Sequence, residues 1–560
     1  MKIVHWVLAL ALLVSLFGVQ VSAGPAQALP SPQPPQPQKA QATASSPVHM
    51  DPAALPVATE PNIDALEQNE VPLLTEDPQA FAAAKKSAAS ASRGPQNAVA
   101  GPDLPAEKSN SAQAENAAGP TNESSGGPTA TAPVGGTAFR GINEAGWRPA
   151  DTNIAAGMTN LVEVTNSRVA VYGKNGAVLR APTALTAWFG YGAAAQVFDP
   201  SITYRGGRFY LVALHKDTAT QTSLILVSVS TTGDATGAWC NYYLQGEQAQ
   251  SNWADFPRVG ATSNKLLIAT NQFRWDNGFF ENNLLLELPK ASLDACAGFG
   301  YSTWWDFFNS NGTRGFTINP ALDYDAFGAN AFYMVNGLGS GNSFTVWRRD
   351  IVGAAWQRYD VGTLAYSIPP DARQPGSLSL IATNDARVLT AVKRYNLLWL
   401  SQTVALNPGC GFNISAVHLA AINAPASTIA APNMYWDQYY WADCNLDYYY
   451  PAAAPDGNGN MLFAMNRSSR SEYPNVRYSG WTFAQMPGQT TAGLFGSTRL
   501  GAAVGAFYEN REPRRWGDYS GIAIDPQAQD NVWAAGMILQ ANNSWTTQIG
   551  RITHRVPSPL

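Results

Sequence analysis

The chain repeats one pattern several times: a polar residue, a short apolar strand, a turn rich in Gly, Asn or Asp, and a longer apolar strand. "RWGDYSGIAIDP" (515–526) and "FDPSITYRGGRFYLVAL" (198–214) are two examples. A repeat near 60 residues that is built from short strands matches one four-stranded propeller blade with its loops. Spacings of 48, 56, 64, 55, 73 and 71 residues separate the seven polar anchors, which are Asp151, Asp199, Asp255, Asn319, Gln374, Asp447 and Asp518.

The repeat predicts an all-β fold, a seven-bladed β-propeller, with six blades as the alternative. The copy that follows Asp199 shows four apolar strands, "SITY", "RFYLVAL", "SLILVSV" and "WCNYYL". Stacked β-sandwiches would have turns every 8–12 residues without a long repeat, and a β-solenoid would need a much shorter period. Sustained helical periodicity is almost absent, which argues against a parallel α/β fold.

The last copy is one strand short. After Asp518 only "GIAI", "VWAAGMI" and "TTQIGRI" remain. We expect the fourth strand to come from "GTAFRGI" at Gly136–Ile142, just before the first copy. Such a pairing would close the ring and remove exposed sheet edges.

The N-terminal quarter differs in composition from the rest. An apolar run from Ile3 to Val19 that ends in Val21-Ser22-Ala23 is typical of a secretory signal peptide. Residues 24–135 are rich in Ala, Pro, Ser and Gln, a composition that cannot bury a core. We therefore predict a signal peptide at 1–23, a disordered linker at 24–135 and a propeller domain at 136–560 of a secreted protein. Whether the linker is a stalk or a removed pro-region stays open.

Charge, hydropathy and cysteine content limit the binding partners and the disulfide pairings that the chain can have. The net charge of −5, with 13% charged residues, offers no basic stripe for nucleic acid. No stretch after the leader is apolar enough to span a membrane, and we expect a monomer without a cofactor. The four cysteines allow three pairings, of which we favour Cys240–Cys296 and Cys410–Cys444 from their places in the repeats.

The anchors of a propeller precede the innermost strands, so they would ring one mouth of the central channel. Clustered carboxylates raise one another's pKa and can bind a cation such as Ca²⁺, accept sugar hydroxyls or act as acid and base. The catalytic candidates are Asp199, Asp255, Asp447 and Asp518. For any single Asp, accepting backbone hydrogen bonds at a turn is the simpler role.

Aromatic residues and arginines crowd the same loops, most densely in "MYWDQYYWADCNLDYYY" at 434–450. Sugar rings stack on aromatic faces, although buried Trp residues also fill gaps between blades. The ligand-binding candidates are Trp253, Arg258, Trp436, Tyr440, Trp441, Arg515 and Trp516. No other motif for nucleophilic, metal or nucleotide chemistry is present.

The region from about 140 to 555 resembles secreted bacterial β-propellers of the sialidase-like superfamily, which carry Asp-box (BNR) repeats. The resemblance rests on "DPSITYRGGRFYLV", "YPAAAPDGNGNMLFAMNRSS", "RWGDYSGIAIDPQAQDNVWAAG" and "TTGDATGAWCNY". In the last of these, Thr232 to Trp239 looks like the Asp-box turn of that superfamily, with one extra residue between Asp234 and Gly237. The resemblance implies a structural hairpin there. Sialidase chemistry would also need an arginine triad and a Tyr–Glu pair, and no spacing picks these out.

Three functions fit these observations. We expect an extracellular propeller that binds a glycan or another cell-surface or polymer ligand at the channel mouth. The alternatives are a sialidase-like glycoside hydrolase or polysaccharide lyase that uses paired mouth carboxylates, and a protein-interaction scaffold.

Overall fold

The computed structural model describes residues 36–58, 69–70, 77–91, 133–144, 146–248, 251–325, 331–337, 339–350, 355–376, 378–425, 431–483, 486, 497–501, 515–540 and 544–554. Strands dominate these residues, so the all-β class is confirmed. None of the described helices is both long and apolar enough to span a membrane. The predicted signal peptide lies outside the described residues.

Seven groups of four antiparallel strands follow one another along the described chain. The first three groups are β6 (Asn153–Ala156), β7 (Asn160–Thr165), β8 (Arg168–Gly173) and β9 (Val178–Ala184); β10 (Gln196–Arg205), β11 (Arg208–Asp217), β12 (Thr222–Ser230) and β13 (Trp239–Gln245); and β14 (Asn252–Ala261), β15 (Lys265–Arg274), β16 (Phe280–Pro289) and β17 (Phe299–Trp305).

The next groups are β18 (Asn319–Pro320), β20 (Ala331–Asn336), β21 (Gly341–Asp350) and β22 (Trp356–Tyr366); β23 (Val388–Arg394), β24 (Leu397–Leu406), β25 (Ile414–Asn423) and β26 (Asn433–Tyr440); β27 (Leu446–Pro455), β28 (Met461–Ser469), β29 (Asn475–Trp481) and β30 (Thr498–Arg499); and β31 (Gly521–Ile524), β32 (Asn531–Leu539), β33 (Trp545–Thr553) and β4 (Val134–Asn143). The short β19 (Leu322–Asp323) pairs in parallel with β14 and β23.

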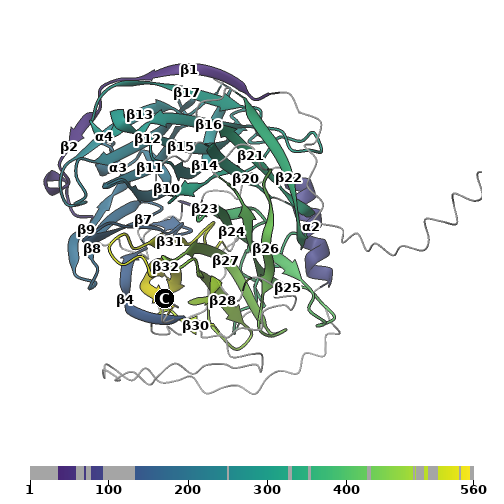
Figure 1. Cartoon of the computed structure of the whole chain (residues 1–560). Helices are drawn as coiled ribbons and strands as arrows, with labels where there is room; N and C mark the ends of the chain where they lie inside the picture. The colour runs from purple at the N-terminus through teal and green to yellow at the C-terminus, as the bar shows by residue number, and fades with distance from the viewer. Residues whose placement is uncertain are drawn as a thin grey trace, which may run out of the picture.

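The groups are arranged around one centre (Figure 1). The first strand of each group contacts the first strand of the next, in the order β6, β10, β14, β18, β23, β27 and β31, and β31 in turn contacts β6. The fourth strands, such as β17 and β22, lie at the periphery. Residues at the start of the first strands are therefore brought together from distant parts of the sequence.

The strand β4 pairs antiparallel with β33, with Phe139 opposite Ile549. This is the pairing that the sequence predicts for Gly136–Ile142. At the same joint, the buried carboxylate of Glu163 on β7 accepts hydrogen bonds from the backbone N–H of Ile142 (2.9 Å) and from the Tyr172 hydroxyl (3.2 Å). The N-terminal strand is thus fixed to both the last group and the first.

Part of the predicted linker is ordered, which corrects the expectation of disorder throughout 24–135. The strand β1 (Gln38–Ala44) pairs antiparallel with the outer edge of β17, and β2 (Val48–Met50) pairs with β13. Edge pairing is made by backbone hydrogen bonds and needs few apolar side chains. Composition alone, which measures the capacity to bury a core, therefore could not reveal these strands.

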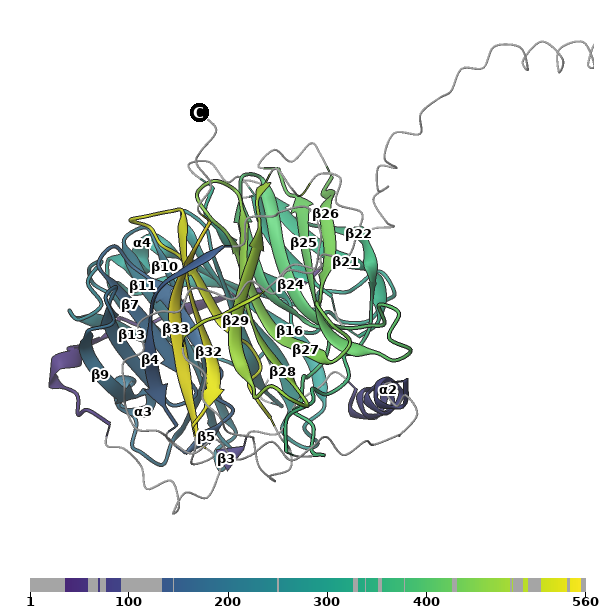
Figure 2. The same ribbon diagram turned by 90° about the horizontal axis from the view of Figure 1, so that it is seen from below.

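The remaining elements are short. They are η1 (Pro52–Ala54), β3 (Asn69–Glu70), α2 (Pro78–Ala91), β5 (Trp147–Arg148), α3 (Leu185–Trp188) and α4 (Lys290–Asp294). Figure 2 shows β3, β5 and α2 at the same end of the molecule. Because β5 leads directly into Asp151, this is the end at which the first strands begin.

Two disulfides join Cys240 to Cys296 and Cys410 to Cys444, as predicted. The Asp-box-like turn connects β12 to β13, and it is held by Asp234, which accepts hydrogen bonds from the backbone N–H (2.9 Å) and the hydroxyl (2.8 Å) of Thr236. These bonds hold the pKa of Asp234 below its usual range. The motif is a structural turn here, as the resemblance implies.

Candidate active site

A left-handed residue followed by proline marks the start of three first strands. Asp199, Phe256 and Tyr450 have φ angles of 49°, 53° and 49°, and each lies in a bulge of β10, β14 or β27. Proline suits such a bulge because it has no N–H to pair. The corresponding residues of three other groups also have positive φ angles; they are Asp151, Thr317 and Asn384.

This structural repeat differs from the sequence anchors in four of these six groups, beginning with Phe256 in place of the neighbouring Asp255. Asn384, and not Gln374, is the left-handed residue before β23, and the Gln374 amide donates to the Ser379 carbonyl instead (3.1 Å). Asn319 lies two residues beyond Thr317, and Asp447 lies three residues before Tyr450. Loops of unequal length precede these strands, so the nearest polar residue in the sequence is not the equivalent one.

Hydrogen bonds between neighbouring groups bring three of the four predicted carboxylates together, with Asp151. Asp151 accepts from the backbone N–H of Asp518 (2.7 Å) and from the amide of Asn166 (2.7 Å). The Asn166 carbonyl oxygen accepts from the backbone N–H of Asp199 (2.7 Å). Asp199 accepts in turn from the backbone N–H of Phe256 (3.3 Å), the residue after Asp255. We call Asp151, Asp199, Asp255 and Asp518 the acid cluster.

The acid cluster is buried, and its members raise one another's pKa. Burial and the charge of Asp518 raise the pKa of Asp151 to about 8. Burial and Asp255 raise the pKa of Asp199 well above its usual range. Burial and Asp518 also raise the pKa of Asp255 to about 6. With a pKa of about 8, Asp151 therefore holds a proton at neutral pH for most of the time.

Arginines compensate part of this charge. The buried Arg515 guanidinium hydrogen bonds to Asp518, and the acid cluster raises its pKa above the usual range. The Asp518 carboxylate also accepts from the Asn384 amide (3.1 Å). Arg258 lies 5.3 Å from the centre of the Tyr519 ring. Its Nε and Nη1 have no hydrogen-bond partner among the described residues, and burial lowers its pKa to about 10.

Asp255 and Asp518 have different surroundings. Asp518 is paired with Arg515 and Asn384, whereas Asp255 Oδ1 is buried without a hydrogen-bond partner among the described residues. Lys216 contributes a positive charge near Asp255, and its ammonium lies 3.2 Å from the centre of the Trp253 ring. The indole of Trp253 therefore already faces a cation of the chain itself.

The hydrogen bonds of Asp447 go to other residues than those of the acid cluster. It accepts two hydrogen bonds from the guanidinium of Arg373, at 2.7 and 3.1 Å, and one from the backbone N–H of the same residue (2.9 Å). Arg373 also donates to the Cys444 carbonyl (2.9 Å). A buried carboxylate held in this way fixes two loops together, and we assign Asp447 this structural role.

The predicted aromatic ligand contacts are mostly core residues. Tyr440 is fully buried against Tyr448, Phe463 and Trp481, and the ring of Trp436 lies 5.1 Å from that of Trp481. Trp441 is partly buried against another cluster of the core, and Trp516 is buried against Tyr449. These rings fill space between groups of strands, which favours a packing role for them.

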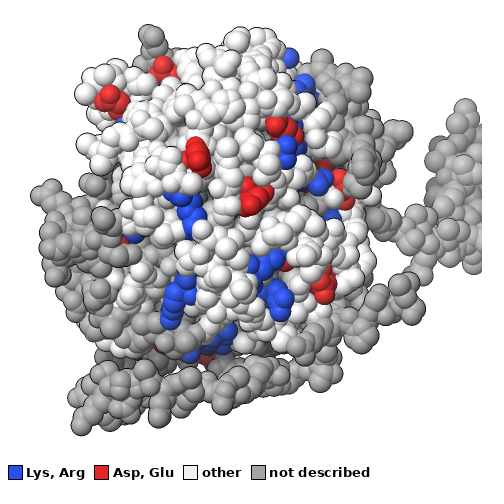
Figure 3. Space-filling model, turned by 90° about the vertical axis from the view of Figure 1, so that its left-hand side faces the viewer, with Lys and Arg blue, Asp and Glu red and all other residues white. Residues whose placement is uncertain are grey.

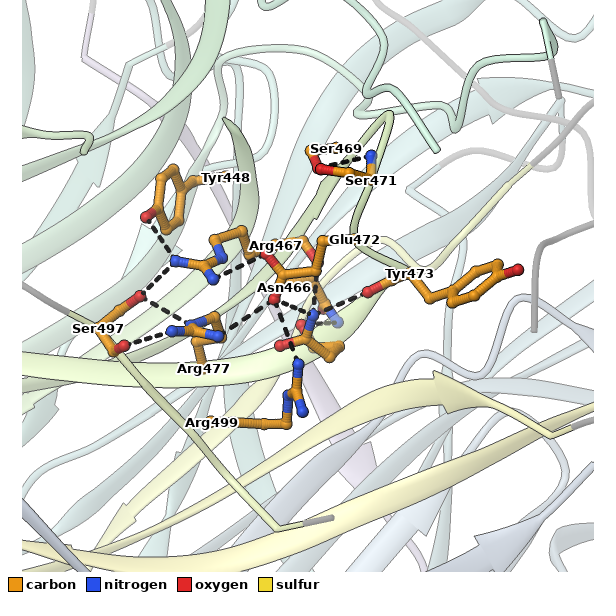
Figure 4. A network of polar contacts seen from close by, with 11 residues as sticks. Tyr448, Asn466, Arg467, Ser469, Ser471, Glu472, Tyr473, Arg477, Ser497 and Arg499 are labelled. Atoms are coloured by element: carbon orange, nitrogen blue, oxygen red, sulfur yellow. Dashed lines mark hydrogen bonds and ion pairs between the residues drawn. The ribbon is translucent and has the colours of Figure 1, made fainter. Parts of the chain in front are cut away.

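Three arginines converge on one carboxylate, as Figure 4 shows. Arg467, Arg477 and Arg499 lie 2.7, 3.1 and 3.6 Å from the oxygens of Glu472. The Ser497 hydroxyl and carbonyl accept further hydrogen bonds from Arg467 and Arg477. The arrangement resembles a carboxylate-binding triad, but Glu472 of the same chain supplies the carboxylate.

Part of the N-terminal segment is attached near the acid cluster. Lys85 on α2 donates to the Pro369 carbonyl (3.0 Å), to Asp371 (2.7 Å) and to the Thr383 hydroxyl (2.9 Å). Thr383 immediately precedes Asn384, which binds Asp518. The helix α2 thus holds the loop that contributes one wall of the acid cluster.

The central channel is narrow. Its cavity has a volume of about 70 Å³ and is lined by residues of the first strands, including Arg258 and Asn319. At about 30 Å³ per water molecule, a cavity of this size holds only two or so waters. We therefore expect a ligand of the acid cluster to approach from the end where the first strands begin.

The charges on the face drawn in Figure 3 and the metal-ligand spacings of the described residues give no other site. Figure 3 shows one side of the molecule, where Lys, Arg, Asp and Glu are scattered among uncharged residues. Among the described residues, the one group with metal-ligand spacing is His49, Cys240 and Cys296. Its two cysteines are joined in a disulfide, which removes them as ligands.

Sequence reasoning missed several residues around the acid cluster. Asp151 was an anchor but not a site candidate, and Asn166 and Asn384 carried no signal beyond their abundance in turns. Arg387 also belongs here, since it pairs with Asp385 (2.6 Å) and lies 4.5 Å from the Phe256 ring. Only the ring arrangement brings these residues together.

No family model and no curated protein matches the chain. Among solved structures, it is similar to a Trypanosoma rangeli sialidase mutant that displays trans-sialidase activity, with a TM-score of 0.33, 11% identity and coverage of 69% of this chain and 57% of the sialidase. It is also similar to the GH93 α-L-arabinofuranosidase of Fusarium graminearum, with a TM-score of 0.33, 8% identity and coverage of 72% and 92%. A Dyadobacter fermentans protein described as of unknown function has a TM-score of 0.35, 9% identity and coverage of 76% and 99%.

Proposed function

We propose that the protein is a secreted seven-bladed β-propeller, closed by β4, whose acid cluster hydrolyses a glycosidic bond. The seven groups of strands and the cyclic contacts of their first strands support this ring. Two disulfides suit an oxidising compartment outside the cytoplasm. The predicted leader at 1–23 and a monomeric state belong to the same proposal.

The observation that carries the proposal is the contrast between Asp255 and Asp518. Glycoside hydrolysis needs one carboxylic acid to protonate the leaving oxygen and one carboxylate to act as nucleophile or base. Asp255 has a raised pKa and an oxygen without a partner, which suits the acid. Asp518 is paired with Arg515, which suits the carboxylate. Two carboxyls with such different hydrogen-bond partners can take different roles in one reaction.

The arginines have a supporting role in this scheme. Arg515 stabilises the charge on Asp518, and the unpartnered nitrogens of Arg258 can donate to sugar hydroxyls. Asp151 and Asp199 accept backbone hydrogen bonds from the neighbouring groups, so they hold the site in place. A substrate must displace some of the residues packed around the acid cluster, because its carboxyls are buried.

Glycan binding without turnover is the second candidate. It is favoured by the partners of Asp518, whose carboxyl is already occupied by the Arg515 guanidinium and the Asn384 amide. These bonds would keep Asp518 in a purely structural role, as single aspartates at turns often are. Both candidates place the ligand at the same end of the molecule.

The two candidates are separated by incubating the full chain with a panel of plant and bacterial polysaccharides and measuring both released reducing ends and retention on the polymer. Hydrolysis predicts release by the wild type and a loss of about 10²–10⁴-fold in Asp255→Asn or Asp518→Asn. The control is Asp276→Asn, an exposed carboxylate between β15 and β16. Retention without release would favour the binding candidate, and neither response would overturn both.

A further inference from the structure

A second pocket lies at the periphery, beside the N-terminal strand. Its volume is about 140 Å³, which is twice that of the channel cavity. The strand β1 contributes Ala40 and Ala42, β17 contributes Tyr301 and Trp305, and the connection from β13 to β14 contributes Glu247. The pocket is therefore completed by a segment whose composition suggested no folded role.

The register of β1 explains why a pocket forms beside β17. Ala40 and Ala42 lie opposite Thr303 and Tyr301 in the β1–β17 pairing. Alternate residues of a strand point to the same face, so Tyr301, Thr303 and Trp305 share one face of β17. The two small alanines on β1 leave room beside these larger side chains, and larger residues at 40 and 42 would fill it.

The chemistry of the lining favours a neutral ligand rich in hydroxyl groups. Glu247 Oε2 is buried without a hydrogen-bond partner among the described residues, and burial raises the pKa of this carboxyl. Gln248 adds an amide, and Trp305 and Tyr301 add aromatic surface. No Lys or Arg lines the pocket, so an anionic ligand would find no counter-charge.

We propose that this pocket binds one ring of a neutral saccharide and that β1 is part of the binding site. The inference goes beyond the proposed hydrolysis and does not depend on the acid cluster, which lies around the central channel. At about 30 Å³ per water molecule, the pocket volume of about 140 Å³ holds several waters. One sugar ring can replace such waters. The remaining rings of a longer oligosaccharide would have to extend into solvent.

The test measures the binding of methyl glycosides to the full chain by isothermal titration calorimetry and saturation-transfer NMR. The sugars are glucose, galactose, mannose, N-acetylglucosamine, xylose and arabinose. We expect at least one glycoside to bind. Trp305→Ala, which removes the ring, and Ala42→Leu, which fills the space, should each weaken it at least tenfold. Phe279→Ala, which removes another exposed aromatic side chain, should stay within twofold of the wild type.

Two controls keep this result distinct from the proposed hydrolysis. Asp255→Asn should retain full binding of the glycoside, whether or not the wild type hydrolyses any polymer. Melting temperatures of the pocket variants should match that of the wild type, so that loss of binding is not loss of fold. The proposal is overturned if no glycoside binds or if both pocket variants bind like the wild type.

Discussion

Glu163 is a single buried carboxyl with a defined structural task at the joint between β4 and the first group of strands. Burial raises its pKa from 4.5 to about 7. The folded protein therefore binds a proton that the unfolded chain releases above about pH 4.5. Stability from this group is complete below that pH and is lost as the pH rises through about 7, by up to about 3 kcal/mol.

Glu163→Gln should retain the acceptor for the Ile142 N–H and remove the titration. We expect the melting temperature of the wild type to fall more steeply between pH 5 and 8 than that of the variant. Differential scanning calorimetry at several pH values measures the difference. Equal slopes for the two proteins would show that Glu163 does not titrate in this range.

Trp436 tests whether the aromatic-rich segment serves packing or binding. Removing this buried ring leaves a cavity against Trp481, so Trp436→Ala should lower the free energy of unfolding by about 3–5 kcal/mol. Trp436→Phe should recover much of that loss and leave glycan binding unchanged. Denaturant unfolding provides the measurement, and a stable Trp436→Ala variant that has lost glycan binding would restore the ligand-binding interpretation.

The sequence predicted the acid cluster better than its surroundings. Asp199, Asp255 and Asp518 were identified because each stands next to a first strand with its turn and hairpin. The sequence could not show that Asp447 differs from these three aspartates. Its ion pair with Arg373 joins two loops that are far apart in the sequence. Burial of Trp436 and Tyr440 could not be read from the sequence either, because β26 presents them to the neighbouring group and not to solvent.

At the scale of elements, β1 and β4 both come from before the repeats, yet they differ in importance. The strand β4 is the fourth strand of the last group and pairs along β33. The strand β1 adds a fifth strand outside β17, a group that already has four. The sequence pattern indicates β4 because the last copy of the repeat has only three strands of its own. The group of β14 to β17 already has four strands, so the repeats give no reason to expect β1.

Deleting Gly136–Ile142 should therefore expose the edge of β33 and cause aggregation. Deleting residues 24–46, which include β1, should leave a soluble protein that melts cooperatively at a lower temperature. Size-exclusion chromatography and calorimetry compare the two deletions directly. A soluble and cooperatively melting Gly136–Ile142 deletion would contradict the role given to β4.

At the scale of the whole molecule, distant segments meet only because the groups of strands follow one another around a centre. Asp151 and Asp518 are 367 residues apart in sequence and share a hydrogen bond. The repeat predicted that the strand starts would converge, which is why part of the site could be inferred without coordinates. The attachment of α2 to Pro369 and Thr383 depends on tertiary contacts that have no sequence period.

The central claim is that Asp255 acts as the acid of a glycosidic hydrolysis at the acid cluster. The most direct measurement is the pH dependence of kcat/KM on whichever polysaccharide the wild type hydrolyses. Because an acid must be protonated and the pKa of Asp255 is raised to about 6, we predict that kcat/KM falls as the pH rises through about 6. Asp255→Asn should be inactive across the range. Activity in Asp255→Asn with the same pH profile as the wild type would contradict the account.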